Sequence, residues 1–465
     1  MTVRLAIADL VTATGGRLLL PPGAQAPMSV SGVTTDSRSA RPGDAFVALR
    51  GPRTDGHRFV ADAMARGAVL AVVSDPSAAA GPAVVVADTL RALGALAALH
   101  RRTLPTTVVG ITGSVGKTTT VGMCAQVLCE RFVTARSAES WNAEIGVALT
   151  LLGLAPSHQV AVVEMAMRGL GQIRDLVEMA RPRIGAVTTI GETHLELLGS
   201  REHIAAAKAE LVEGLPADGV AIVNADEAAS ARLVRDARCR IVRFGMVPEA
   251  DVRATEVRSS AEGCRFTLHV DREAAPARLP LVGLHQVRNA LVAAAVGRAL
   301  GLSLDEIVAG LARARVAKMR GEILTADDVI LIDDSYNASP QSMAAAFEVL
   351  RQVGGARRRI LALGEMRELG PASPAFHRQV GAQAAALAPA LLVAVGEGAR
   401  AYLDGAQAAG LSARAVVWVA SAQEAIPIVR AAIRSGDVVL VKGSRAVEME
   451  HVVGALRARE VTGGL

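Results

Sequence analysis

The strongest constraint on the fold is a short apolar run that ends in a glycine loop and continues into a helical pattern. Residues 107–112 read Thr-Val-Val-Gly-Ile-Thr, and the loop that follows consists of Gly113, Ser114, Val115, Gly116, Lys117 and Thr118. A strand, a glycine turn and a helix in this order direct backbone N–H groups and the helix dipole at one point, which suits a phosphate group. A lysine here adds positive charge at the terminal phosphates, and the threonine hydroxyl can bind Mg²⁺.

The loop departs from the strict phosphate-loop pattern, because Ile111 stands where that pattern has its first glycine. The alternative interpretation is a turn that only starts a helix. The apolar run before the loop and the helical pattern from Thr118 onward favour a nucleotide site.

Strand-like and helix-like patterns alternate along the chain, whose 465 residues correspond to about three domains. Strand-like runs recur after the glycine loop at 160–163, 184–189 and 220–223, and again at 329–332, 359–363, 391–395, 416–419 and 438–441. This alternation is typical of parallel sheets with helices on both faces. We therefore predict an α/β protein with an N-terminal α/β domain (1–103), a central phosphate-loop domain on a parallel sheet (104–313) and a C-terminal Rossmann-like, doubly wound domain (314–465).

Four other segments complete the prediction. A helix at 88–102 leads to Pro105, a plausible domain boundary. A second helix is predicted at 202–211 and a third, rich in alanine, at 286–300. A more polar, strand-like stretch at 253–270 interrupts the alternation in the central block.

Composition excludes several classes of protein. No apolar run reaches the roughly 18 residues that a membrane span needs, and the N-terminus lacks the apolar core of a signal peptide, so we expect a cytoplasmic protein. The four cysteines show no metal-ligand spacing. A net charge of +5 comes from dispersed arginines, and two Trp and two Tyr give no series for base stacking, so we expect no nucleic-acid partner. We expect a monomer.

The shortened loop from Thr112 to Thr119 resembles the phosphate loop of the Mur ligase family, whose members assemble the peptide of bacterial cell-wall precursors. The resemblance covers nearly the whole chain in the same order. Its other motifs are Asp36-Ser37-Arg38, Glu164-Met165, His194-Leu195-Glu196, Lys208-Ala209-Glu210-Leu211, Asn289-Ala290-Leu291 and Lys442-Gly443-Ser444-Arg445. The resemblance implies an ATP-dependent ligase whose N-terminal domain binds a uridine nucleotide.

The C-terminal motifs resemble those of one member of the family. They are Asp334-Ser335-Tyr336-Asn337-Ala338-Ser339-Pro340, Gly364-Glu365-Met366-Arg367-Glu368-Leu369-Gly370 and the Lys-Gly-Ser-Arg motif already named. That member uses ATP and Mg²⁺ to join D-alanyl-D-alanine to UDP-N-acetylmuramoyl-tripeptide through an acyl phosphate. The alternatives are a member that adds a single amino acid, a catalytically silent nucleotide-binding homologue, and a phosphotransferase.

The resemblance also implies roles for individual residues. The catalytic set is Lys117, Glu164, His194 and Lys208. The metal ligands are Thr118, Glu164, His194 and, if its amine carries carbon dioxide as a carbamate, Lys208. The ATP-binding set is Thr112, Gly113, Ser114, Val115, Gly116, Lys117, Thr118, His285, Asn289, Arg320 and Asp334. The substrate-binding set is Ser37, Arg38, Tyr336 and Asn337.

Each role has a simpler alternative when the residue is taken alone. Lys208 is then a solvated helix lysine, Arg320 a surface arginine and Arg38 part of an exposed turn. The chain also departs from the family pattern at Thr189, where an asparagine is usual, and at Glu192, which adds a negative charge near the expected metal site.

Overall fold

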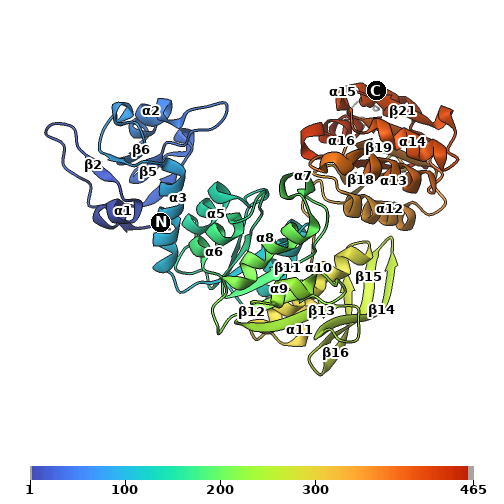
Figure 1. Cartoon of the computed structure of the whole chain (residues 1–465), viewed down its shortest axis with the longest axis horizontal. Helices are drawn as coiled ribbons and strands as arrows, with labels where there is room; N and C mark the ends of the chain where they lie inside the picture. The colour runs from blue at the N-terminus through green and yellow to red at the C-terminus, as the bar shows by residue number, and fades with distance from the viewer. Residues whose placement is uncertain (1–2, 459–465) are drawn as a thin grey trace.

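The computed structural model describes residues 3–458, arranged as three groups of elements that each have their own sheet (Figure 1). Met1, Thr2 and residues 459–465, which are the outer ends of the first and last predicted domains, lie outside the described residues. In Figure 1 the N-terminal group (blue) and the C-terminal group (orange to red) stand on opposite sides of the central group.

The N-terminal group contains a five-stranded sheet in the order β2-β7-β6-β5-β4. Strands β4 to β7 are mutually parallel, and β2 is antiparallel to β7. The strands are β2 (Arg17–Leu19), β4 (Gly32–Thr34), β5 (Asp44–Val47), β6 (Leu70–Val73) and β7 (Ala83–Val85), with a two-stranded pair of β1 (Leu5–Ala6) and β3 (Ser29–Val30). The helices are α1 (Ile7–Thr14), α2 (Val60–Ala65) and α3 (Thr89–Arg102), with short 3₁₀ turns at Ser37–Ser39, Gly56–Phe59 and Pro76–Ala78.

The central group contains a nine-stranded sheet in the order β16-β15-β14-β13-β12-β11-β8-β10-β9. The phosphate loop follows β8 (Thr107–Thr112). This strand belongs to a set of six parallel strands with β9 (Thr134–Arg136), β10 (Val160–Glu164), β11 (Ile184–Val187), β12 (Val220–Asn224) and β13 (Arg240–Gly245). The sheet continues as β14 (Val252–Ser260), parallel to β13, and then as the antiparallel strands β15 (Gly263–Val270) and β16 (Glu273–Leu279).

Helices cover both faces of this sheet because its strands are apolar on both sides. Alternate residues of β8 enter different cores: Val108 packs in one, and Val109 and Ile111 in the other. The first core is covered by α5 (Glu144–Leu152), α6 (Gln172–Ala180) and α8 (Arg201–Glu213), and the second by α4 (Lys117–Leu128), α10 (Leu284–Ala299) and α11 (Leu304–Ala312). Two short helices, α7 (Leu195–Leu198) and α9 (Ser230–Val234), complete the group.

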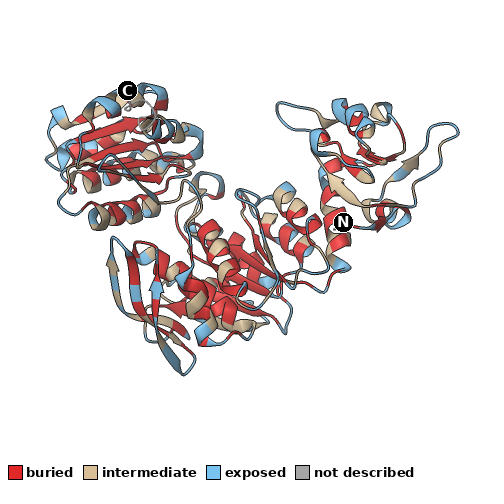
Figure 2. Ribbon diagram, turned by 180° about the vertical axis from the view of Figure 1, so that it is seen from behind, coloured by how far each residue is buried: buried red, intermediate tan, exposed pale blue. Residues whose placement is uncertain are grey.

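The C-terminal group is doubly wound, as predicted. Its sheet has the order β17-β18-β22-β19-β20-β21, and all strands except β17 are parallel. The strands are β17 (Glu322–Ala326), β18 (Val329–Asp334), β19 (Arg359–Gly364), β20 (Leu391–Val395), β21 (Val416–Val419) and β22 (Val438–Lys442). One face packs on α12 (Pro340–Gly354), α13 (Ser373–Ala385) and α14 (Arg400–Ala408), and the other on α15 (Ala422–Ala432) and α16 (Glu450–Arg457). The buried strands form the red centre of this group in Figure 2. The remaining 3₁₀ turns are Gly370–Ala372, Ala413–Ala415 and Arg445–Val447.

The sequence prediction located the buried strands well and the exposed ones poorly. The apolar runs after the glycine loop and in the C-terminal block all form strands, and the stretch at 253–270 is a hairpin of β14 and β15. β13, β16 and the edge strand β17 were not predicted. β13 and β16 mix exposed and partly exposed residues with a few buried ones rather than forming an apolar run, so they lack the signal that marks a buried strand.

The predicted domain boundaries at 103/104 and 313/314 stay predictions. α3 packs closely on α5 and α6, so one hydrophobic core extends across the first of them. Within residues 3–458, no helix is both long enough and apolar enough to span a bilayer.

Candidate active site

A cavity of about 610 Å³ lies between the central and C-terminal groups. It opens at the carboxyl ends of parallel strands, where ligands of open α/β sheets bind. Thirteen of the predicted site residues line it: Ser114, Val115, Gly116, Lys117, Thr118, Glu164, His194, His285, Asn289, Arg320, Asp334, Tyr336 and Asn337. Thr112, Gly113, Lys208, Ser37 and Arg38 do not.

The phosphate loop has no space for a side chain at its two glycines, because other atoms lie close to them. Gly113 and Gly116 have φ angles of 148° and 86°, and Gly116 caps the N-terminus of α4. A Cβ atom on Gly113 would lie 1.9 Å from the hydroxyl of Thr188, and one on Gly116 would lie 2.5 Å from Asn289 Oδ1. The loop therefore needs glycine for both its conformation and its packing.

The segment after β11 clamps the loop from the side. The amide of Ser114 donates to the carbonyl of Thr189 (2.9 Å), and the amide of Val115 donates to the Thr189 hydroxyl (3.0 Å). The Thr188 hydroxyl donates to the carbonyl of Val115 (2.6 Å), and the amide of Gly191 donates to the Ser114 hydroxyl (2.8 Å). Thr189 departs from the family pattern, yet its hydroxyl still contacts the loop.

Lys117 is folded onto the loop that it follows. Its Nζ donates to the carbonyl of Gly113 at 2.7 Å. Burial lowers the pKa of Lys117, the charge of Arg320 lowers it further, and Glu164 opposes both effects. Thr112, at the end of β8, is wholly buried, and its hydroxyl has no hydrogen-bond partner among the described atoms.

Glu164 ends β10, as predicted, and is buried beside Thr118. The Thr118 hydroxyl donates to Glu164 Oε2 and the Asn142 side-chain amide donates to Oε1, both at 2.8 Å. One buried carboxylate and one hydroxyl beside a phosphate loop are the donors that Mg²⁺ takes when phosphate oxygens and water supply the remaining ligands. Among residues 3–458, no group of three or more His, Cys, Asp or Glu residues is placed to hold a metal ion.

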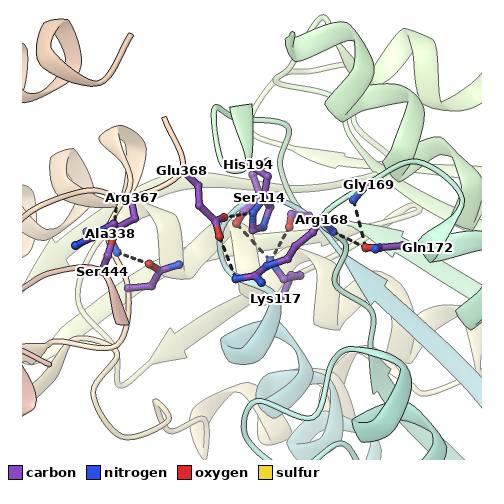
Figure 3. Close-up of polar contacts among 12 residues, drawn as sticks. Ser114, Lys117, Arg168, Gly169, Gln172, His194, Ala338, Arg367, Glu368 and Ser444 are labelled. Atoms are coloured by element: carbon purple, nitrogen blue, oxygen red, sulfur yellow. Dashed lines mark hydrogen bonds and ion pairs between the residues drawn. The ribbon is translucent and has the colours of Figure 1, made fainter. Parts of the chain in front are cut away.

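His194 lies at the start of α7, in a left-handed conformation with a φ angle of 65°. Its Nδ1 is hydrogen-bonded to Glu368 Oε2 from the C-terminal group, and the other oxygen of Glu368 pairs with Arg168 at 3.0 Å (Figure 3). Burial lowers the pKa of His194, and Glu368 opposes this effect.

Lys208 is not solvated. It lies on α8, within the predicted helix, and is only 2% exposed. None of the described carboxylates forms an ion pair with it. Burial and the charge of Lys117 lower the pKa of Lys208 well below its ordinary value.

His285 and Asn289 lie one turn apart on α10, which begins early enough to place both on the cavity. Asn289 is buried; its Oδ1 accepts from the Thr120 hydroxyl (3.2 Å) and its Nδ2 donates to Gln286 (3.1 Å). Burial, with smaller contributions from Lys442 and Arg288, lowers the pKa of His285 to about 4.

The C-terminal group supplies a charged wall. Asp334, the last residue of β18, pairs at 2.6 Å with Lys442, the last residue of β22, and Lys442 also donates to the carbonyl of Asn337 (2.8 Å). Burial raises the pKa of Asp334, and Lys442 opposes this effect. The guanidinium group of Arg320 lies 3.9 Å from the centre of the Tyr336 ring. The Tyr336 hydroxyl reaches Ser140 of the central group at 2.8 Å.

Ser37 and Arg38 lie in the N-terminal group, away from the cavity residues. Asp36 caps their 3₁₀ turn and forms a two-point ion pair with Arg38 (2.9 and 2.7 Å). The hydrogen bond from Arg38 lowers the pKa of Asp36 to about 2. Their role toward a substrate stays a prediction.

Several residues in and around the cavity were given no role from the sequence, although Lys442 and Glu368 stand in the C-terminal motifs. Asn142, Gln286, Lys442 and Glu368 contact predicted site residues, and Arg168 contacts Glu368. Lys442 had a usable signal, because it directly follows a buried apolar run whose carboxyl end belongs to the same sheet edge as Asp334. The contacts of Asn142 and Glu368 join segments with no shared sequence pattern.

Three protein-family descriptions match successive parts of the chain. "Mur ligase family, catalytic domain" matches residues 29–101, "Mur ligase middle domain" matches 111–297, and "Mur ligase, glutamate ligase domain" matches 319–445.

Individual proteins match over nearly the whole length. A UDP-N-acetylmuramoyl-tripeptide–D-alanyl-D-alanine ligase from Escherichia coli is 38% identical over 440 residues, which cover 93% of this chain and 95% of that protein. The protein of the same name from Synechocystis is 34% identical and covers 99% of this chain and all of its own. A crystal structure of MurF from Acinetobacter baumannii has a TM-score of 0.89 at 35% identity, covering 98% of this chain and 99% of that one.

Proposed function

The chain belongs to the Mur ligase family, and on this premise we propose that it joins D-alanyl-D-alanine to UDP-N-acetylmuramoyl-tripeptide in peptidoglycan precursor synthesis. The reaction is an ATP-dependent ligation that forms a C–N bond between an acid and an amine. Relatives with this activity in their names align over nearly the whole chain at 34–38% identity.

One observation carries the proposal in structural terms. A single cavity joins the phosphate loop of the central group to Arg320, Asp334 and Tyr336 of the C-terminal group. A reaction that consumes a nucleotide and joins two other substrates needs such a shared, closable space, because water would hydrolyse an activated carboxylate.

The chemistry begins with attack of the tripeptide carboxylate on the γ-phosphate of ATP, which gives an acyl phosphate and ADP. The amine of the dipeptide then attacks the acyl carbon, and inorganic phosphate leaves from the tetrahedral intermediate. The first step brings two anions together, so catalysis depends on positioning and on neutralising charge. Lys117 would exchange the carbonyl of Gly113 for the terminal phosphates, and Arg320 would approach them from the opposite wall.

Mg²⁺ fits the buried oxygen donors of Thr118 and Glu164, and when bound it would neutralise phosphate charge. The structure gives Lys208 properties that suit a carbamate. Its amine is buried, its pKa is lowered, and only the neutral form of an amine reacts with carbon dioxide. A carbamate would place an anion near Lys117 and His194, where a second metal ion would be held.

The residues predicted to bind the two substrates belong to different groups of elements. We propose that Ser37 and Arg38 contact the uridine-diphosphate end of the tripeptide substrate, and that Tyr336 and Asn337 contact the dipeptide. Cytoplasmic location and a monomeric state complete the proposal, to be tested by cell fractionation and light scattering.

The decisive experiment incubates the purified chain with ATP, Mg²⁺, UDP-N-acetylmuramoyl-tripeptide and D-alanyl-D-alanine. We expect phosphate release that depends on the dipeptide, and a product with the mass of the two substrates less one water. Tripeptides with diaminopimelate or lysine at the third position are compared in parallel. Release of phosphate with a single amino acid but not with the dipeptide would assign the chain to another member of the family. A phosphorylated product, or ATP binding without turnover, would reject ligation.

A further inference from the structure

Glu368 of the C-terminal group contacts His194, the predicted catalytic histidine. It lies in the loop between β19 and α13, and its carboxylate is shared by His194 and Arg168 of the central group (Figure 3). The side chains of His194 and Glu368 are only 19% and 29% exposed, so solvent screens this pair less than a surface ion pair.

The loop that carries Glu368 is fixed within its own group. The amide of Met366 donates to His377 Nε2 and the amide of Arg367 donates to the Ser444 hydroxyl, both at 2.9 Å. The side chains of Met366 and Leu369 are each 2% exposed. Glu368 itself has a φ angle of 63°, which turns the loop toward the central group. A carboxylate on such a platform moves with the C-terminal group as a rigid part of it.

A backbone contact accompanies the side-chain contacts. The amide of Glu196, two residues after His194, donates to the carbonyl of Glu368 at 3.1 Å. A Cβ atom on Gly370 would lie 3.2 Å from the Cα of Glu196, so the two segments pack closely. Since α7 and this loop belong to different groups, these contacts exist only while the groups are together.

The chemistry of the contact assigns a role to the carboxylate. A carboxylate that accepts from Nδ1–H holds the imidazole in one tautomer and leaves Nε2 with the free lone pair, as carboxylates do behind ligand histidines. The mechanism of the proposed function gives Glu368 no contact with the reacting atoms.

We propose that Glu368 is a positioning residue that orients His194 and, together with Arg168, holds the C-terminal group closed on the central group. The orientation of the histidine is thereby made to depend on closure. The part that concerns catalysis rests on the proposed function, whereas the part that concerns closure does not.

The test compares Glu368→Ala, Glu368→Gln and Arg168→Ala with the wild-type chain. Glu397→Gln is the matched control, because Glu397 forms an exposed ion pair with Arg400 within the C-terminal group. Steady-state kinetics give kcat and the KM for each substrate. Small-angle X-ray scattering, with a non-hydrolysable ATP analogue and Mg²⁺, gives the radius of gyration without any turnover.

We expect Glu368→Ala to lower kcat by about 10- to 100-fold, as loss of such partners does, and to give a larger radius of gyration than the wild type. Glu368→Gln should recover part of kcat, because its amide oxygen still accepts from Nδ1–H. Arg168→Ala should enlarge the molecule with a smaller loss of kcat. The control should match the wild type in both measurements.

Two outcomes would overturn the inference: a kcat of Glu368→Ala within twofold of the wild type, or an unchanged radius of gyration in both alanine variants. Absence of ligase activity in the wild type would instead reject the proposed function, and the scattering comparison would still decide the closure.

Discussion

The ion pair between Lys442 and Asp334 allows a stability prediction worked directly from distances. Lys442 is 2% exposed, Asp334 is 21% exposed, and their charged atoms are 2.6 Å apart. At an effective dielectric constant of about 20, two unit charges at that distance attract by about 6 kcal/mol, which is offset by several kcal/mol for the desolvation of each ion. The intact pair therefore adds little to the free energy of unfolding. Removing one partner leaves a buried charge without a counter-charge, which is strongly destabilising.

Replacing Lys442 by Met removes one partner without changing the volume much. Breaking a buried pair costs about 3–5 kcal/mol, and the partial exposure of Asp334 places this one at about 3 kcal/mol. The C-terminal group has roughly 140 residues, and the entropy of unfolding is about 2.1 cal/mol/K per residue. A loss of about 3 kcal/mol in the free energy of unfolding therefore lowers the Tm of this group by about 10 °C. The double variant Lys442→Met/Asp334→Asn should recover most of the loss, because no buried charge remains.

The assay uses the two tryptophans of the chain. A Trp141→Phe background leaves Trp418 of β21, whose indole N–H donates to the carbonyl of Gly396 at 2.8 Å, as the reporter of C-terminal unfolding. Glu348→Gln is the control: it removes one charge of an exposed ion pair on α12, where such pairs contribute about 0–1 kcal/mol. The reasoning is refuted if Lys442→Met lowers Tm by less than about 3 °C, or if the double variant is as unstable as the sum of the single variants.

Three further predictions concern the cavity. Gly116→Ala should lower kcat/KM for ATP at least tenfold, because Asn289 Oδ1 lies 2.5 Å from the added atom. Gly410→Ala, at a φ angle of 92° with nothing within 4 Å, is the control for a strained glycine outside the cavity, and equal activity of the two variants would contradict the prediction. His285 has its pKa lowered to about 4, so between about pH 4 and pH 6.5 the unfolded chain binds a proton that the folded chain does not. The free energy of unfolding should therefore fall as pH falls from about 7 to about 4, less steeply in His285→Gln; equal slopes in denaturant titrations would exclude this histidine as the cause. Lys208→Ala should lose at least 100-fold in kcat and regain part of it with added acetate, whereas full activity without acetate would reject the carbamate.

Elements whose signal is local could be predicted from the sequence. A buried parallel strand is a continuous apolar run, so β8, β10, β11 and the parallel strands of the C-terminal group could be predicted from a few residues each. The phosphate loop needed only the glycines, Lys117 and the helix behind them. The edge strand β17 escaped because only two of its five residues, Ile323 and Leu324, are large and apolar.

The contacts between residues far apart in the sequence follow from the tertiary fold. Asn142 reaches Glu164 from a loop 22 positions away, and Glu368 reaches His194 across 174 positions and between two groups of elements. No periodicity links such residues, because their contact depends on how whole sheets are placed. Burial is decided in the same way: the sequence around Lys208 predicts an ordinary helix lysine, and only the packing of α8 against the central sheet makes its amine a buried, readily neutral group.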